Sequence, residues 1–220
     1  MAKFFNYFPK TLYSANTSTT ALDSVTNIIA RFAFQNSLKQ NSSAFYKYQI
    51  QESDTPEIIA NKYYGNSERH WVVLLFNDII DPQFDWPLKS DTLIEYIDQK
   101  YSANGAANTT VQSGLAWAMS VNNTQAYLKV ITSTANDGTV TTTKLQVDAN
   151  TYANVAATTN SYTTDAGELV TISISKEKRT YYDYELEENE GKREIKLLKP
   201  EFVPAVEKEF KKIIKQWHLK

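Results

Sequence analysis

The chain has 220 residues, enough for one or two compact domains, and its 23 lysines and arginines nearly balance 25 aspartates and glutamates. The formal net charge of −2 gives no global reason to expect nucleic acid or an anionic membrane as partner. No cysteine and only two histidines are present, which excludes disulfides, thiol catalysis and a cysteine- or histidine-rich metal cluster.

The amino-terminal segment MAKFFNYFPK contains a lysine but neither an apolar core nor a small-residue cleavage site, so it does not read as a secretory signal. The longest apolar run, Trp71–Phe76, is far too short to span a bilayer. We therefore expect a soluble protein made in a cytoplasm.

Residues 1–44 are predicted to form an arm. It begins with a dense group of aromatic residues and continues through a polar stretch. A short helix is predicted next from apolar residues spaced three and four apart, namely Leu22, Val25, Ile29 and Phe32. The arm either packs on its own domain or docks on another subunit, because so much apolar surface needs a cover. Its candidate partner-binding residues are Phe4, Phe5, Tyr7, Phe8, Leu12 and Tyr13.

Residues 45–101 are predicted to form a compact unit that opens with a strand and a capped helix. The segment Phe45–Gln51 alternates as a strand does. Either Asp54 or Thr55 can cap the following helix, since Pro56 suits its first turn and Asp54 and Glu57 have the spacing of a capping box. Gly65 supplies the left-handed end of this helix.

The same unit continues with two more predicted helices. The first runs from about Ser67 to Phe76, and its buried side carries Trp71, Leu74 and Leu75. A short returning strand is expected near Ile79 and Ile80, and a third helix covers Asp91–Tyr101.

Residues 102–175 change character, because charged side chains become rare and Thr, Asn, Ala and Ser dominate. Two alternating segments flank Asn136-Asp137-Gly138, a strong hairpin signal. Glu168–Ser175 gives a further strand. The region is therefore predicted to be a small inserted β-domain rather than a disordered linker.

Residues 176–220 are highly charged and are predicted to form a hairpin and a helix. Thr180–Glu188 and Lys192–Leu198 would be the two strands, and the helix would start at Pro200 or Pro204. Glutamates interleave with its lysines, so a solvated face over a docked apolar stripe is favoured over an RNA or membrane surface. The candidate dock is Phe210, Ile214 and Trp217.

The order of elements in residues 45–82 resembles a LysM module. The matching residues are Tyr48 and Ile50 on the strand, Ser53-Asp54-Thr55 at the cap, Ile58-Ile59-Ala60 with Tyr63 on the helix, and Asn77, Ile79, Asp81 and Pro82 in the later loop. The resemblance implies a βααβ unit. Its groove residues would be Ser53, Asp54, Thr55, Asn77, Ile79 and Asp81.

Three features together resemble one family. A Tyr-Gly-Asn before a Trp-bearing helix, the aromatic arm and the segment REIKLLKPEFVPAVEKEF are similar to the baseplate wedge subunit of contractile-tailed phages known as gene product fifty-three. The resemblance covers residues 1–101 and about 176–217. The block at 102–175 departs from the short form of that family.

Three candidate functions are compatible with the sequence to different degrees. The family resemblance implies a structural subunit of a contractile-tail baseplate wedge that binds other wedge and hub-proximal tail proteins in the virion, assembled in the host cytoplasm. The alternative is a LysM protein that binds peptidoglycan or chitin, which ranks second because a single site binds weakly and one copy is present. An enzyme is not expected, since paired carboxylates lack a supporting cluster. No cofactor, metal, nucleic acid or membrane is expected, and the overall class is α+β.

Overall fold

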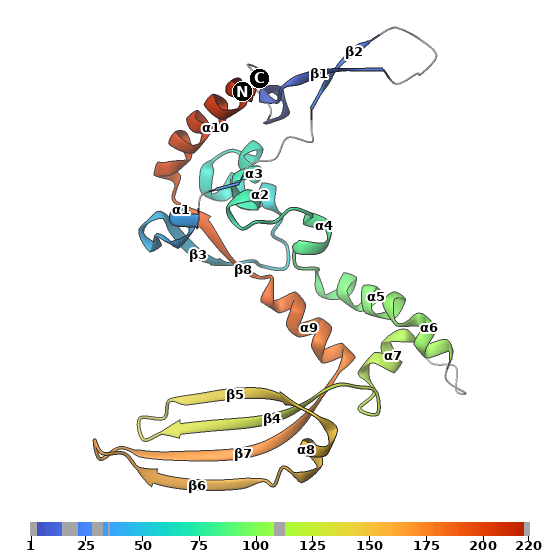
Figure 1. Cartoon of the computed structure of the whole chain (residues 1–220), viewed down its shortest axis with the longest axis vertical. Helices are drawn as coiled ribbons and strands as arrows, with labels where there is room; N and C mark the ends of the chain where they lie inside the picture. The colour runs from blue at the N-terminus through green and yellow to red at the C-terminus, as the bar shows by residue number, and fades with distance from the viewer. Residues whose placement is uncertain (1–3, 15–21, 28–32, 35, 108–112, 218–220) are drawn as a thin grey trace. The chain divides into compact units, whose positions relative to one another are not determined.

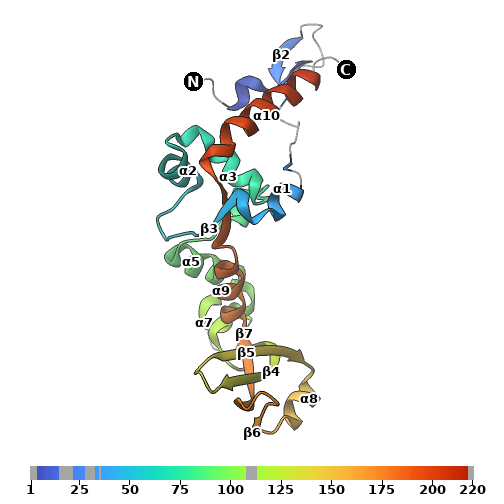
Figure 2. The same cartoon turned by 90° about the vertical axis from the view of Figure 1, so that its left-hand side faces the viewer.

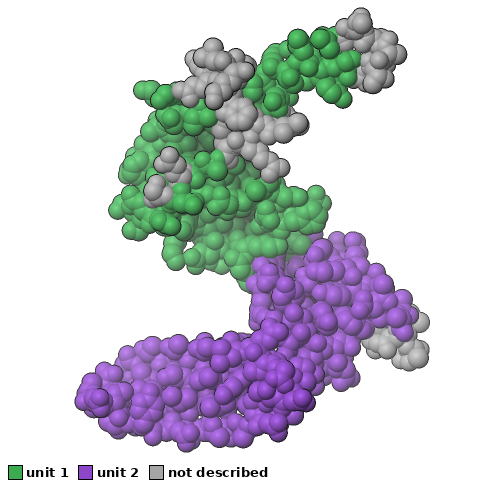
Figure 3. Space-filling model, viewed as in Figure 1, with its two compact units in different colours: residues 1–89, 190–220 green, residues 90–189 purple. Residues whose placement is uncertain are grey.

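The computed structural model describes residues 4–14, 22–27, 33–34, 36–107 and 113–217 (Figure 1). Helices and antiparallel sheets both contribute, which confirms the α+β class. The chain divides into two compact units, coloured separately in Figure 3. The first unit is Met1–Lys89 with Glu190–Lys220, and the second is Ser90–Asn189, so the second is an insertion in the sequence of the first. The division into four regions, 1–44, 45–101, 102–175 and 176–220, remains a prediction.

The first unit begins with a short 3-10 turn and a two-stranded hairpin. Its elements are η1 (Phe4–Tyr7), β1 (Lys10–Tyr13) and β2 (Asp23–Thr26), with Lys10 opposite Thr26. The predicted helix is therefore wrong over Asp23–Thr26, where pairing with β1 overrides a weak helical spacing. Two positions of that prediction, Ile29 and Phe32, lie outside the described residues.

The body of the first unit surrounds a second two-stranded sheet. Its elements in chain order are α1 (Asn36–Gln40), η2 (Ser42–Ala44), β3 (Phe45–Gln49), α2 (Pro56–Tyr64), η3 (Ser67–Arg69), α3 (His70–Phe76), α4 (Pro82–Asp85), β8 (Glu194–Leu198), η4 (Pro200–Phe202) and α10 (Val203–Trp217). The predicted strand at β3, the helices at α2 and α3, and the last helix are all confirmed.

Helix α2 shows local sequence signals acting as expected, with one exception. The Thr55 hydroxyl accepts from the Ile58 N–H, Pro56 is the first residue, and Gly65 ends the helix at φ 65°. The predicted capping box of Asp54 and Glu57 is wrong. The Asp54 carboxylate instead accepts hydrogen bonds from the Tyr48 hydroxyl and the Gln51 N–H, so it serves the β3–α2 loop.

The strand that closes this sheet comes from the far end of the chain. Strand β8 pairs antiparallel with β3, Phe45 opposite Leu198 and Gln49 opposite Glu194. The predicted returning strand at Ile79 and Ile80 is wrong, because the chain makes a turn there: the Ile79 N–H donates to the Leu74 carbonyl oxygen. The edge of β3 is thus completed by residues more than a hundred positions later.

The core of the first unit lies between α3, β8 and α10. Trp71, Val72, Val73 and Phe76 of α3 are buried, whereas the predicted core residues Leu74 and Leu75 are half-buried. Helix α3 is tied to β8 by Asn77, whose amide donates to the Val73 and Lys196 carbonyl oxygens, both at 2.8 Å, and accepts from the Lys196 N–H. Other large side chains buried in this unit include Phe8, Ile50, Ile59, Tyr64, Ile79, Ile195, Leu197, Leu198, Val203, Phe210 and Ile214.

The second unit combines helices with a four-stranded antiparallel sheet. Its elements are α5 (Ser90–Lys100), α6 (Ser102–Ala106), α7 (Gly114–Met119), β4 (Thr124–Ala135), β5 (Val140–Val147), α8 (Ala149–Asn154), β6 (Thr158–Thr163), β7 (Leu169–Thr180) and α9 (Tyr181–Gly191), whose last residues fall in the first unit. The strand order is β5-β4-β7-β6. The predicted helix at 91–101, the hairpin around Gly138 and the strand in 168–175 are confirmed.

The predicted carboxy-terminal hairpin is wrong, because its first strand is helix α9. The Asp183 N–H donates to the Thr180 hydroxyl oxygen at 3.1 Å, and the Asp183 carboxylate accepts from the Thr180 N–H at 3.2 Å. This reciprocal pair is a capping box, which starts a helix. The other predicted strand does form, as β8, but it pairs with β3.

Candidate partner-binding surfaces

The first half of the arm is anchored within the first unit. The rings of Tyr7 and Phe8 contact Phe210 of α10, with centroids 6.4 and 6.2 Å apart, and Figure 2 shows η1 beside α10. The Lys211 ammonium lies 4.8 Å from the centroid of the Tyr7 ring. Phe8 is buried. These contacts fix the base of the arm to the carboxy-terminal helix.

The predicted dock on α10 is filled by this chain. Phe210 stacks on Trp71 with ring centroids 4.8 Å apart and is buried, as is Ile214. The side chains of Phe4 and Trp217, both predicted to bind a partner, lie outside the described residues. The structure therefore brings Tyr7, Phe8 and Phe210 together in one aromatic cluster.

The second half of the arm is exposed. We call β1 and β2 the arm hairpin; it leaves 66% of Leu12, 59% of Tyr13 and 58% of the adjoining Leu22 exposed to solvent. Phe5, at the base of the arm, is 55% exposed. Successive strand residues project to opposite faces, so Leu12 and Tyr13 place apolar surface on both sides. A lone two-stranded hairpin is marginally stable in water and normally needs a further layer. Sequence reasoning missed Leu22 and Val25 as part of this surface, because their spacing fitted a helix.

The first loop of the expected groove is held by internal hydrogen bonds. Burial, followed by the hydrogen bond to Asp54, raises the pKa of Tyr48, so this hydroxyl stays a donor to the carboxylate. The Trp86 indole N–H donates to the Asp54 carbonyl oxygen at 3.2 Å. Thr55 caps α2, and Ser53 is exposed. These groups stabilise the loop itself.

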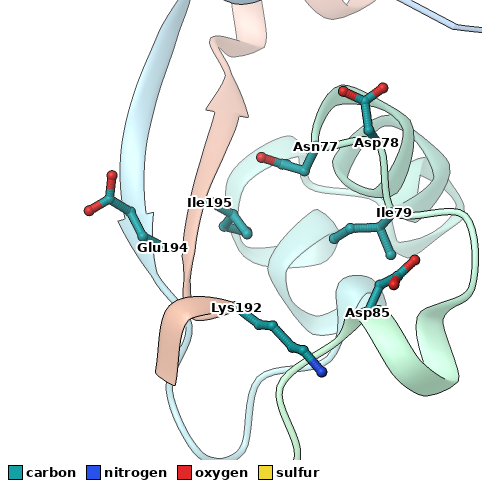
Figure 4. Close-up of a pocket in the computed structure, with 7 residues that line it drawn as sticks. All are labelled: Asn77, Asp78, Ile79, Asp85, Lys192, Glu194 and Ile195. Carbon is teal, nitrogen blue, oxygen red and sulfur yellow. The ribbon is translucent and has the colours of Figure 1, made fainter. Parts of the chain in front are cut away.

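The second loop lines a cavity of about 340 Å³ in the first unit (Figure 4). Its lining residues are Asn77, Asp78, Ile79, Asp85, Lys192, Glu194 and Ile195. Of the six predicted groove residues, only Asn77 and Ile79 are among them; Asp81 instead caps α4 through the Gln83 N–H. The two predicted loops thus do not meet in this cavity.

The polar groups around the cavity are engaged in holding the 77–85 loop. The Asp85 carboxylate accepts from the Ile80 and Asp81 N–H groups at 3.2 and 3.0 Å. Lys192 donates to the Phe84 carbonyl oxygen at 2.7 Å, and Asp78 pairs with Lys39.

Within the described ranges, no three His, Asp or Glu side chains gather as metal ligands. No helix in that same part of the chain has the length and apolar character to cross a membrane.

The arm is anchored at its base and carries exposed apolar side chains on its hairpin, and the polar groups of the loops are engaged within the chain. These are features of a structural protein that assembles with other proteins. Comparison of the sequence with known proteins agrees with this class of protein. The family described as base plate wedge protein 53 matches residues 3–213, so the chain belongs to this family. The wedge-family prediction from the sequence is confirmed, whereas the LysM-like description of residues 45–82 stays a prediction.

One relative is the baseplate wedge protein gp53 of Enterobacteria phage T4, which is 38% identical over 58 residues. The match covers 26% of this chain and 30% of the T4 protein. The chain therefore spans less than a third of that relative's length.

Proposed function

We propose that this chain joins wedge components, and neighbouring wedges, of a contractile phage tail baseplate by inserting its arm hairpin into a neighbouring protein. The observation that carries the proposal is the exposure of Leu12, Tyr13 and Leu22 on a hairpin too small to be stable alone. A neighbouring subunit that covers both faces of the hairpin would supply the missing layers.

The anchored base supports the same role. Because Tyr7 and Phe8 pack on Phe210, the chain entering the hairpin starts from a fixed place on α10. Preorganisation of this kind lowers the entropy lost on binding. The partners are other wedge and hub-proximal tail proteins, met in the host cytoplasm during assembly.

The chemistry is binding and not catalysis. The carboxylates nearest the cavity are engaged, Asp78 by Lys39 and Asp85 by two backbone N–H groups, which suits a structural loop. The near-neutral net charge of −2 supports partners other than nucleic acid or an anionic membrane.

The test is co-purification with the structural proteins encoded beside this gene. We expect the double variant Leu12→Ser/Tyr13→Ser to lower recovery of a neighbour by about tenfold or more, because buried aromatic and aliphatic anchors dominate interfaces. The matched control is Ile58→Ser on α2, where a 49% exposed apolar side chain is removed away from the arm. Unchanged recovery with the arm variant, or equal loss with Ile58→Ser, would refute the proposal.

A further inference from the structure

The four-stranded sheet of the second unit has one apolar face. The register places Ile131 of β4 opposite Ile174 of β7, and Val170 of β7 opposite Tyr162 of β6. Since alternate residues share a face, Ile172 and Leu145 lie on the same side. We call this side the isoleucine face; it comprises Ile131, Leu145, Tyr162, Val170, Ile172 and Ile174.

The opposite side of the sheet is closed by its own polar contacts. The hydroxyl oxygens of Ser161 and Thr171 lie 2.9 Å apart, and Lys144 pairs with Glu177 at 3.0 Å. This pair lies beside Leu128 and Val130, which are buried. On the isoleucine face, Ile131, Val170, Ile172 and Ile174 are half-buried, whereas Leu145 and Tyr162 are exposed.

Helix α8 covers one end of the isoleucine face only. Its Tyr152 ring contacts Tyr127 with centroids 4.8 Å apart, and the Lys176 ammonium donates to the Tyr152 and Ala153 carbonyl oxygens, both at 3.3 Å. Farther along, Leu145 is 46% and Tyr162 50% exposed. Antiparallel sheets with one apolar face bury that face against a second layer, and a further layer here would complete the burial of the half-buried isoleucines.

Charges on and around the isoleucine face are separated along the strands, apart from Asp148, which is engaged as the cap of α8. Three lysines of the isoleucine face, Lys129, Lys176 and Lys178, lie towards the α8 end. Three exposed carboxylates, Asp137, Asp165 and Glu168, lie in the two turns at the other end. The middle of the face carries no charged residue. Two such faces laid together in opposite directions would place each basic end over an acidic end.

We propose that the isoleucine face packs against the same face of a second copy of this chain, with the two sheets antiparallel and related by a two-fold axis. Such an interface is self-complementary, as two-fold contacts require. The sheets would lie about 10 Å apart with their isoleucines interdigitated. This contact is separate from the arm hairpin, so either proposal can fail while the other stands.

The first test is the oligomeric state of the purified full-length chain by sedimentation equilibrium. We expect a dimer, and Ile172→Lys should raise the dissociation constant at least about tenfold, because a buried apolar side chain is replaced by a charge. The matched control is Ser173→Lys, one residue along β7 on the polar face. It should leave the dimer intact. A chain that is monomeric at every concentration, or equal effects of the two variants, would overturn the proposal.

The second test separates the contact from the fold of the sheet. Lys178→Glu and Glu168→Lys each place like charges together in the antiparallel dimer, so each should weaken it severalfold. The double variant restores opposite charges at both ends and should recover the dimer. Circular dichroism checks that each variant keeps its strands. Failure of the double variant to recover dimerisation would contradict the antiparallel arrangement.

Discussion

Gly114 lies where helices α5 and α7 of the second unit approach each other closely. A Cβ at this position would lie 2.1 Å from the Asp98 carbonyl oxygen and 2.7 Å from the Ser102 nitrogen, both backbone atoms. The Asp98 carboxylate also accepts from the Leu115 N–H at 2.8 Å, which fixes the start of α7. We predict that Gly114→Ala lowers the free energy of unfolding by about 1–3 kcal/mol, because backbone cannot move aside as a side chain can. Chemical denaturation of the full chain measures it.

Gly191, the last residue of α9, is the matched control for that substitution. A Cβ there would meet no atom within 4 Å, and its backbone is not left-handed. Gly191→Ala should therefore stay within about 0.5 kcal/mol of the native stability, as surface changes usually do. Equal losses at the two glycines would show that the contact with Asp98 does not determine the effect at Gly114.

The two kinds of glycine also show what a sequence reveals about single residues. Gly65 was predictable, because a left-handed helix end depends on neighbouring residues only. Gly114 was not, since its contact belongs to α5, which lies far enough along the chain that no local pattern encodes it. The arm aromatics divide in the same way: their apolar character was readable, but the division into anchored Phe8 and exposed Tyr13 depends on where α10 lies.

At the scale of elements, local signals predicted strands β3, β4, β5 and β7 and helices α2, α3, α5 and α10. They missed strands β1, β2 and β6 and the short helices α4, α6, α7 and α8. Strands β4 and β5 followed from alternation around Gly138. Helix α9 was mistaken for a strand because its tyrosines alternate, although Thr180 and Asp183 carry a capping-box spacing that could have revealed it. The partner of β8 could not be predicted, because no local pattern specifies which distant strand completes β3.

Helix α8 gives a prediction for this scale, since Asp148 caps it. The Thr151 hydroxyl and N–H, followed by the Asn150 N–H, hold the pKa of the Asp148 carboxyl below its ordinary value of 3.8. A depressed pKa means that the carboxylate stabilises the fold above pH 3.8 and that this contribution is lost as the pH falls below it. We therefore expect the unfolding temperature to fall with acidification through that range.

The variant Asp148→Asn tests the assignment. Asparagine also caps helices well but does not titrate here, so the variant should keep α8 while showing a shallower loss of unfolding temperature with acid. Asp137, whose pKa is also lowered by the Thr139 N–H, supplies a second acid-sensitive group in the same sheet. Identical pH profiles for the native chain and Asp148→Asn would contradict the role given to Asp148.

At the scale of the whole molecule, hydrogen bonds join the two segments of the first unit that the insertion separates in sequence. Arg193 donates to the Glu52 carboxylate at 2.9 Å, to the Ile50 carbonyl oxygen at 3.4 Å and to the Leu88 carbonyl oxygen at 3.5 Å. The hydrogen bonds of this buried side chain hold together three segments that the sequence separates widely. Composition indicated an insertion, but the pairing of β3 with β8 was invisible to it, because that pairing depends on both ends of the insertion leaving the first unit close together.

That closeness makes the insertion removable. Since Leu88 and Arg193 are in contact, a short Gly/Ser linker can replace residues 90–189 without stretching the chain. We predict that the shortened protein folds and that β3–β8 pairing is favoured by roughly 1–2 kcal/mol, because a shorter loop loses less entropy on closure. Its unfolding temperature, followed by fluorescence of the buried Trp71, measures this. Co-purification with wedge proteins through the arm should persist while self-association is lost; an unfolded product would instead mean that the second unit is required to fold the first.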